Sequence, residues 1–150
     1  MPAFRLFVLT AVAVCSFGLS QAGFAEEALA IITKRDSALS SLPLETIKLV
    51  YLRKLLLDDN NNRWIPLNLS STHELRQIFS LLMFKKLPED LEEYWNEQYF
   101  QGVSPPQVLA SEEAVLRFVA MTPGALGYVR MQNVDDRVKV LKTIAIPEHK

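Results

Sequence analysis

The chain has 150 residues, 49% of them hydrophobic, and its 16 basic and 17 acidic residues give a formal net charge of −1. This balance excludes the basic surface that nucleic-acid-binding proteins present. The length corresponds to one domain of ordinary size with a single hydrophobic core.

The first 25 residues have the layout of a secretory signal peptide. Arg5 precedes an apolar run from Leu6 to Leu19, and small and polar residues follow up to Ala25. The run is shorter than the ~20 residues a membrane-spanning helix requires, which favours cleavage after Ala25 over a membrane anchor. We expect a signal peptide over residues 1–25 and one α/β domain over residues 26–150, with no membrane span after cleavage.

The position of the cysteine indicates the cellular compartment of the mature protein. The only cysteine, Cys15, lies inside the expected signal peptide, and Val14 before it argues against a lipoprotein site. The mature chain would therefore contain no disulfide, no catalytic thiol and no cysteine ligand for a metal. An exported chain without cysteines fits a bacterial periplasm better than a disulfide-rich secreted scaffold.

The first half of the mature chain alternates strand and helix patterns. Residues 28–33, ALAIIT, read as a buried strand, and residues 42–57 as a helix with Pro43 in its first turn. Residues 63–69, RWIPLNL, alternate like a strand, and Pro66 suggests an edge position because proline cannot donate to the ladder. The expected core face of the helix consists of Leu44, Ile47, Val50 and Tyr51.

Three helices and three strands are expected in the second half. Ser71 and Glu74 form a capping-box pattern at the start of the helix over residues 71–84. A second helix covers residues 87–100 and ends at Gly102, and Ser111 caps a third over residues 111–121. The expected strands are residues 107–110, 126–130 and 137–146.

The stretch TPGALGYV, residues 122–129, links the last helix to the next strand. Pro123 and Gly124 are a turn signal, because proline presets φ and glycine accepts a positive φ. Gly127 inside the following apolar run suggests a close backbone approach. Strands alternating with helices predict an α/β fold, a three-layer mostly parallel sheet with helices on both faces.

The sequence gives no support for an enzyme. His73 and His149 are the only histidines and lack metal-ligand spacing, and no serine sits in a nucleophile motif. We expect no catalytic residue, no metal site and no cofactor. The aromatic residues at helical spacing favour core packing over a ligand platform; they are Tyr94, Trp95, Tyr99 and Phe100.

One segment has the chemistry of an anion site. The turn SSTHE, residues 70–74, joins the end of a strand to the start of a helix, where α/β proteins bind ligands and where free N–H groups favour an anion. The alternative is that Ser71 only caps the helix and that His73 is only a polar residue near the cap. The candidate ligand-binding residues are Ser70, Ser71, Thr72, His73 and Arg76.

Several segments together resemble the phosphate-binding proteins of bacterial ABC transporters, in particular their small exported relatives. The similar segments are LPLETIKLVYLRK, WIPLNLSSTHELRQIF, the EYW segment and TPGALGYV, of which TPGALGYV is the most specific. The resemblance extends over residues 42–141. The resemblance implies a type 2 periplasmic-binding-protein fold, of which this chain is long enough for about one lobe. It also implies phosphate or another small anion as ligand and an ABC permease as partner.

The sequence departs from the family at two positions. Aligned on Arg76, the turn in which the family carries Ser-Gly-Thr-like residues has His73, Glu74 and Leu75, which brings in a negative charge and removes a hydroxyl. The first helix also lacks the glycine that usually ends it. These departures leave open an alternative function, an envelope interaction or sensory module that kept the fold and lost its ligand.

Overall fold

The structure is a computed structural model that describes residues 26–148, so the expected signal peptide and His149 lie outside it. The order of helices and strands is the expected one. The elements are β1 (Ala28–Lys34), α1 (Leu44–Tyr51), β2 (Ile65–Leu69), α2 (Glu74–Phe84), η1 (Pro88–Leu91), α3 (Glu92–Phe100), β3 (Gln107–Leu109), α4 (Glu112–Met121), β4 (Ala125–Arg130), η2 (Met131–Asn133) and β5 (Val138–Ala145).

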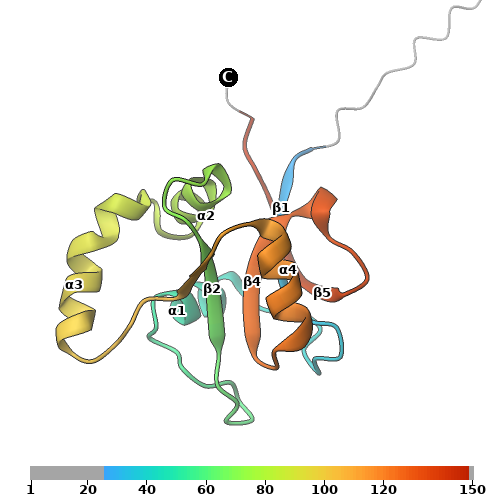
Figure 1. Cartoon of the computed structure of the whole chain (residues 1–150), viewed down its shortest axis with the longest axis horizontal. Helices are drawn as coiled ribbons and strands as arrows, with labels where there is room; N and C mark the ends of the chain where they lie inside the picture. Colours follow the sequence, from blue (N-terminus) through green and yellow to red (C-terminus); the bar gives the residue numbers. More distant parts are fainter. Residues whose placement is uncertain (1–25, 149–150) are drawn as a thin grey trace, which may run out of the picture.

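The strands form one sheet in the order β3-β2-β4-β1-β5 (Figure 1). β2 is parallel to both β3 and β4, whereas β1 is antiparallel to both β4 and β5. Four of the five strands therefore run in one direction and β1 alone runs against them. The α/β class is confirmed, and the sheet is mixed because of β1.

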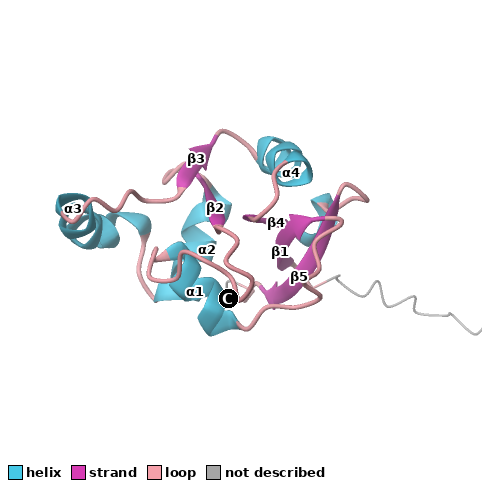
Figure 2. Ribbon diagram, turned by 90° about the horizontal axis from the view of Figure 1, so that it is seen from below, coloured by secondary structure: helices cyan, strands magenta, loops and turns pink. Residues whose placement is uncertain are grey.

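Helices cover both faces of the sheet, as expected. α1 and α2 lie on one face and α4 on the other (Figure 2). Successive residues of β4 contact the two layers, since Tyr128 stacks on Phe79 of α2 and Gly127 faces α4. This is the alternation of side chains that a strand imposes.

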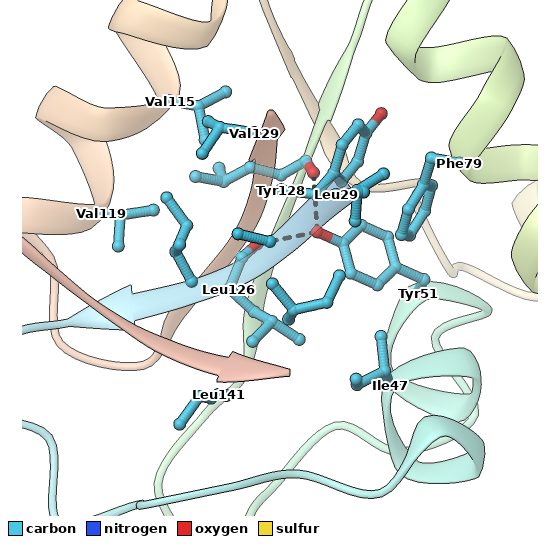
Figure 3. Close-up of a cluster of buried hydrophobic side chains, with 14 of the residues drawn as sticks. Leu29, Ile47, Tyr51, Phe79, Val115, Val119, Leu126, Tyr128, Val129 and Leu141 are labelled. Atoms are coloured by element: carbon cyan, nitrogen blue, oxygen red, sulfur yellow. Dashed lines mark hydrogen bonds between the residues drawn. The ribbon is translucent and has the colours of Figure 1, made fainter. Parts of the chain in front are cut away.

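Aromatic side chains fill the layer between the sheet and α2. The rings of Phe79 and Tyr128 are stacked with 3.9 Å between their centroids, and the ring centroid of Tyr51 lies 4.7 Å from that of Phe79. The Tyr51 hydroxyl donates to the carbonyls of Leu67 and Leu126, at 3.0 and 3.1 Å, and so joins β2 to β4 (Figure 3). Burial raises the pKa of Tyr51 well above its ordinary value, so the hydroxyl keeps its proton.

The stretch TPGALGYV forms the predicted turn and close approach. Ala125 N–H donates to the Thr122 carbonyl at 3.2 Å, and Gly124 has a φ of +79°. Proline in the second position and glycine in the third is the pattern of a type II turn. At Gly127 an added Cβ would lie only 2.6 Å from Val115 Cγ1, so α4 can pack on β4 only where the side chain is absent.

Three expectations about individual positions are wrong. Pro66 does not lie on an edge strand, because β2 is paired on both sides; β3, however, is short and pairs only from Leu67 onward, so no neighbour needs a donor at Pro66. Leu44 is exposed instead of facing the core. The aromatic residues of α3 do not pack in the core either, as Tyr99 is 71% and Phe100 is 89% exposed.

The carboxylate of Glu113 on α4 is expected to titrate unusually low. Arg137 donates to both its oxygens at 2.9 and 3.0 Å, and Arg117 adds a third bond at 2.9 Å. Hydrogen bonds from Arg137 and then from Arg117 lower the pKa of Glu113 to about 2. The stabilisation is therefore present above the ordinary glutamate pKa and is lost as the pH falls through about 2.

A pH titration followed by NMR of the Glu113 side chain tests this assignment. Arg137→Gln is expected to move the Glu113 midpoint upward. Arg35→Gln, an exposed arginine elsewhere, is the matched control and leaves it unchanged. The same midpoint in Arg137→Gln and wild type would contradict the assignment.

Candidate functional site

The segment between β2 and α2 is a tight turn at the carboxyl end of β2. His73 N–H donates to the Ser70 carbonyl at 2.9 Å, and the hydroxyls of Ser70 and Thr72 lie 3.1 Å apart. The turn therefore satisfies part of its own hydrogen-bonding capacity. It also holds Ser70 and Ser71 at the carboxyl end of β2.

The helix cap differs from the expected one. Helix α2 begins at Glu74, and His73 is its N-cap, because Nδ1 of His73 accepts from Leu75 N–H at 3.1 Å. The expected capping box of Ser71 and Glu74 is wrong, since the backbone of Ser70 to His73 closes the turn before the helix starts. His73 therefore uses its Nδ1 to cap the helix.

Removing this cap is expected to destabilise the protein. His73→Ala leaves the Leu75 N–H without its partner and should lower the free energy of unfolding by about 1 kcal/mol. Ser71→Ala is the control and should have almost no effect on stability. Chemical denaturation of the two variants checks the assignment, and a larger loss from Ser71→Ala would restore the sequence-based cap.

A cavity of about 420 Å³ lies beside this turn. Three of the five candidate residues line it, namely Ser70, Ser71 and Arg76, whereas Thr72 and His73 do not. Helix α3, at the left of Figure 1, and the chain leading into β3 contribute the remaining wall. The other lining residues are Asn68, Glu92, Trp95, Asn96, Pro105, Pro106 and Val108.

Arg76 supplies the positive charge of the cavity. Its Nη1 donates to the Leu69 carbonyl at 3.3 Å, which holds the guanidinium at the end of β2. Within residues 26–148, Arg76 makes no ion pair with a carboxylate. A guanidinium has five N–H donors in a planar fork, so several donors remain for a ligand.

A buried polar network lies at the inner end of the cavity. The Tyr128 hydroxyl accepts from Leu69 N–H at 3.2 Å and donates to Asn68 Oδ1 at 3.0 Å. Burial raises the pKa of Tyr128 to about 12, although Leu69 N–H and Arg76 act in the opposite direction. The hydroxyl therefore stays protonated at neutral pH and orients the Asn68 amide.

The carboxylate of Glu74 is neutralised by a partner outside the cavity. Glu74 pairs with Arg130 at the end of β4, at 2.6 Å. Arg130 also pairs with Glu27, and its backbone N–H donates to Glu112 in the first turn of α4, at 2.8 Å. The negative charge that departs from the family pattern is thus directed toward Arg130.

Comparison with known proteins gives a match by structure alone. No family model and no curated protein matches the sequence. A protein from Clostridium perfringens, described as a phosphate ABC transporter substrate-binding protein and solved with bound phosphate, superposes with a TM-score of 0.64 at 20% identity, over 77% of this chain and 44% of that one. An ABC-type phosphate transport receptor from Vibrio cholerae gives 0.63 at 17% identity, and PstS from Borrelia burgdorferi gives 0.58 at 15%; each match covers 77% of this chain and 46% of the other.

This chain has the fold of phosphate ABC transporter substrate-binding proteins. The resemblance noted from the sequence is confirmed at the level of the fold. The chain spans less than half the length of the solved proteins it matches. The candidate cavity lies at the carboxyl end of β2, where open α/β sheets bind their ligands.

Within this binding-protein fold, the sequence-based site omitted several lining residues. Asn68 had a usable signal, because it is an amide in the otherwise apolar strand IPLNL, two residues before Ser70. Trp95 and Asn96 had none, since helical spacing does not show that α3 stands beside the turn. Pro106 enters the wall because β3 pairs with β2.

A larger cavity of about 730 Å³ lies at the opposite end of β2 and β4, and three of its four charged side chains have partners; the fourth, Arg63, makes no ion pair within residues 26–148. Lys34 pairs with Asp36 at 2.7 Å. The Asp58 carboxylate accepts from the N–H groups of Asn60 and Asn62 and from the Asn62 amide. These bonds lower the pKa of Asp58 and leave little capacity for a ligand.

Two further observations apply to residues 26–148. No group of three or more His, Cys, Asp or Glu side chains there is placed to hold a metal ion. In the same part of the chain, no helix has the length and apolar character needed to cross a membrane.

Proposed function

We propose that the protein is an exported solute-binding protein that takes a small anion in the cavity beside Arg76. The observation that carries the proposal is that Arg76 has no carboxylate partner within residues 26–148 and shares a cavity with two serines and a buried amide. N–H and O–H donors around one guanidinium favour a negatively charged group, because hydrogen bonds to a charged acceptor are stronger than those to a neutral one. Thr72 and His73 shape the turn, and Ser70, Ser71 and Arg76 contact the ligand.

The cellular context is part of the same proposal. The signal-peptide pattern over residues 1–25 supports export to a periplasm. The fold shared with phosphate transport proteins supports phosphate as a candidate ligand and an ABC permease as a candidate partner. Cell fractionation tests the export, and a cytoplasmic protein would contradict it.

Calorimetric titration of the purified protein tests anion binding. We expect heat on addition of phosphate or acetate at millimolar concentration in a low-salt buffer, because the site is open and holds a single cation. Arg76→Gln should weaken binding by about tenfold to a hundredfold, as charge-assisted hydrogen bonds are lost. Arg117→Gln, an exposed arginine on α4, is the control. Binding unchanged by Arg76→Gln, or no heat with phosphate, acetate or phenylacetate, would refute the proposal.

The alternative is an envelope interaction module that kept the fold and binds no anion. The observation that favours it is the exposure of Tyr99 and Phe100 on α3, a helix with no buried residue. Under this alternative the protein self-associates through α3 and gives no heat with anions. Light scattering of wild type and of Tyr99→Ser/Phe100→Ser distinguishes the two functions, since a dimer lost in the double variant supports the alternative.

A further inference from the structure

The inner end of the cavity beside Arg76 contains an amide donor without a partner. Asn68 is 5% exposed and lines this cavity. The Tyr128 oxygen already accepts from Leu69 N–H, so its own proton goes to Asn68 Oδ1, which leaves the Nδ2 group pointing away from Tyr128. That Nδ2 donates to no residue between 26 and 148. Between residues 26 and 148 the buried side-chain atoms without a partner are Arg53 Nε and Trp64 Nε1, so solvent in the cavity reaches Asn68 Nδ2, and a ligand acceptor would take the place of water there.

This end of the cavity therefore suits a group with two or more acceptor oxygens. Arg76 offers the unused N–H groups of its guanidinium, and Ser70 and Ser71 offer hydroxyls from the turn. A carboxylate has two acceptor oxygens that match a guanidinium fork. Phosphate would satisfy the same donors, so this end alone does not separate the two chemistries.

The outer wall of the cavity contains an apolar surface, which distinguishes an organic carboxylate from phosphate as a ligand. Trp95 of α3 faces the segment before β3, and Pro105, Pro106 and Val108 complete this wall. Contact between an apolar group of a ligand and the indole and proline rings favours binding, because both surfaces are removed from water. Phosphate has no such surface, whereas an organic carboxylate brings an apolar body with its charged head.

The charge on the rim points the same way. Glu92 lines the same cavity at the start of α3 and forms no ion pair within residues 26–148. Its carboxylate repels an anion in the cavity, and so cancels more of the attraction to Arg76 when the anion carries two charges than when it carries one. Phosphate approaches a double charge near neutral pH, and a carboxylate keeps a single one.

We propose that the cavity beside Arg76 binds an organic monocarboxylate with an apolar body in preference to phosphate. The head group contacts Arg76, Asn68 and the serines, and the apolar body lies against Trp95 and Pro106. This inference rests on the proposed anion-binding function and narrows its ligand class.

Calorimetric titrations with phenylacetate, acetate and phosphate test the proposal. Phenylacetate is expected to bind about tenfold more tightly than acetate, the gain from covering one ring. It is also expected to bind more tightly than phosphate. Trp95→Leu should lower the affinity for phenylacetate by a larger factor than the affinity for acetate, and so remove most of the difference between the two. Tyr99→Leu, an exposed aromatic of the same helix that does not line the cavity, is the matched control.

A second variant pair tests the rim charge. Glu92→Gln is expected to raise the affinity for phosphate more than the affinity for phenylacetate. Glu93→Gln, the adjacent exposed carboxylate outside the cavity, should change neither.

The outcomes separate this inference from the function on which it rests. Phosphate bound more tightly than phenylacetate, or a phenylacetate affinity unaffected by Trp95→Leu, overturns the ligand class and leaves anion binding in place. No heat with any of the three anions refutes anion binding itself, and the ligand class with it.

Discussion

Gly127→Val is expected to lower the free energy of unfolding by about 3 kcal/mol, and the melting temperature by about 10 °C. Even a single Cβ at this position would lie 2.6 Å from Val115 Cγ1 and 3.2 Å from Val119 Cγ2, both on α4. Valine in a helix has one strongly preferred χ1 rotamer, so Val115 cannot turn its methyl group aside. The helix would have to move off the sheet, and thermal unfolding measures the loss.

A second-site variant shows whether the contact with α4 is the cause. In a Val115→Ala background, where the closest methyl group is absent, Gly127→Ala is expected to cost less than in wild type. Gly102→Ala is the control: its Cβ would meet no atom within 4 Å, although its φ of +80° imposes some backbone strain. An unchanged melting temperature in Gly127→Val would refute the close approach.

Phe79→Ala is the second large effect, with an expected loss of about 4 kcal/mol in the free energy of unfolding. Phe79 is buried, and its ring stacks on that of Tyr128 with 3.9 Å between the ring centroids. The ring centroids of Tyr51 and Phe84 lie 4.7 and 6.2 Å from that of Phe79. Truncation would leave a cavity bounded by three aromatic rings, each of which loses a packing partner. Phe100→Ala, an 89% exposed phenylalanine, should change stability by less than about 0.5 kcal/mol.

The same variant tests how the core supports the candidate site. Tyr128 carries both the ring that stacks on Phe79 and the hydroxyl that orients Asn68. If Phe79 positions this tyrosine, Phe79→Leu should weaken anion binding even where the protein remains folded. Urea denaturation and calorimetry on Phe79→Leu measure the two effects separately. Equal anion affinity in Phe79→Leu and wild type would show that the polar network holds Tyr128 without the stack.

The order of elements was predictable because each one carries a local signal. Ser111 caps α4 as expected, accepting from Ala114 N–H at 3.1 Å, and Gly124 and Gly127 have the expected turn and packing roles. These signals act within a few residues of the chain. The direction of β1 was not predictable in this way, since it is fixed by pairing with strands near the other end of the chain.

The candidate site was predictable only in the part that is local. Ser70, Ser71 and Arg76 follow from a strand that ends in a turn and a helix. Asn68 carries a local signal, but Tyr128, the partner that orients its amide, lies sixty residues later and is adjacent only in the folded protein. The burial of Tyr99 was expected from the helical spacing of four aromatic residues, but α3 extends beyond the edge of the sheet and leaves this side chain exposed (Figure 2).

The position of β1 has a consequence for how the protein reaches its native state. β1 lies in the interior of the sheet, and both of its neighbours, β4 and β5, come from the last third of the chain. During synthesis the first strand therefore emerges long before any strand that can pair with it. Pairing over so large a separation in sequence is slow, because a long loop must close before any contact forms. We expect the nascent chain to remain without the pairing of β1 until synthesis is nearly complete.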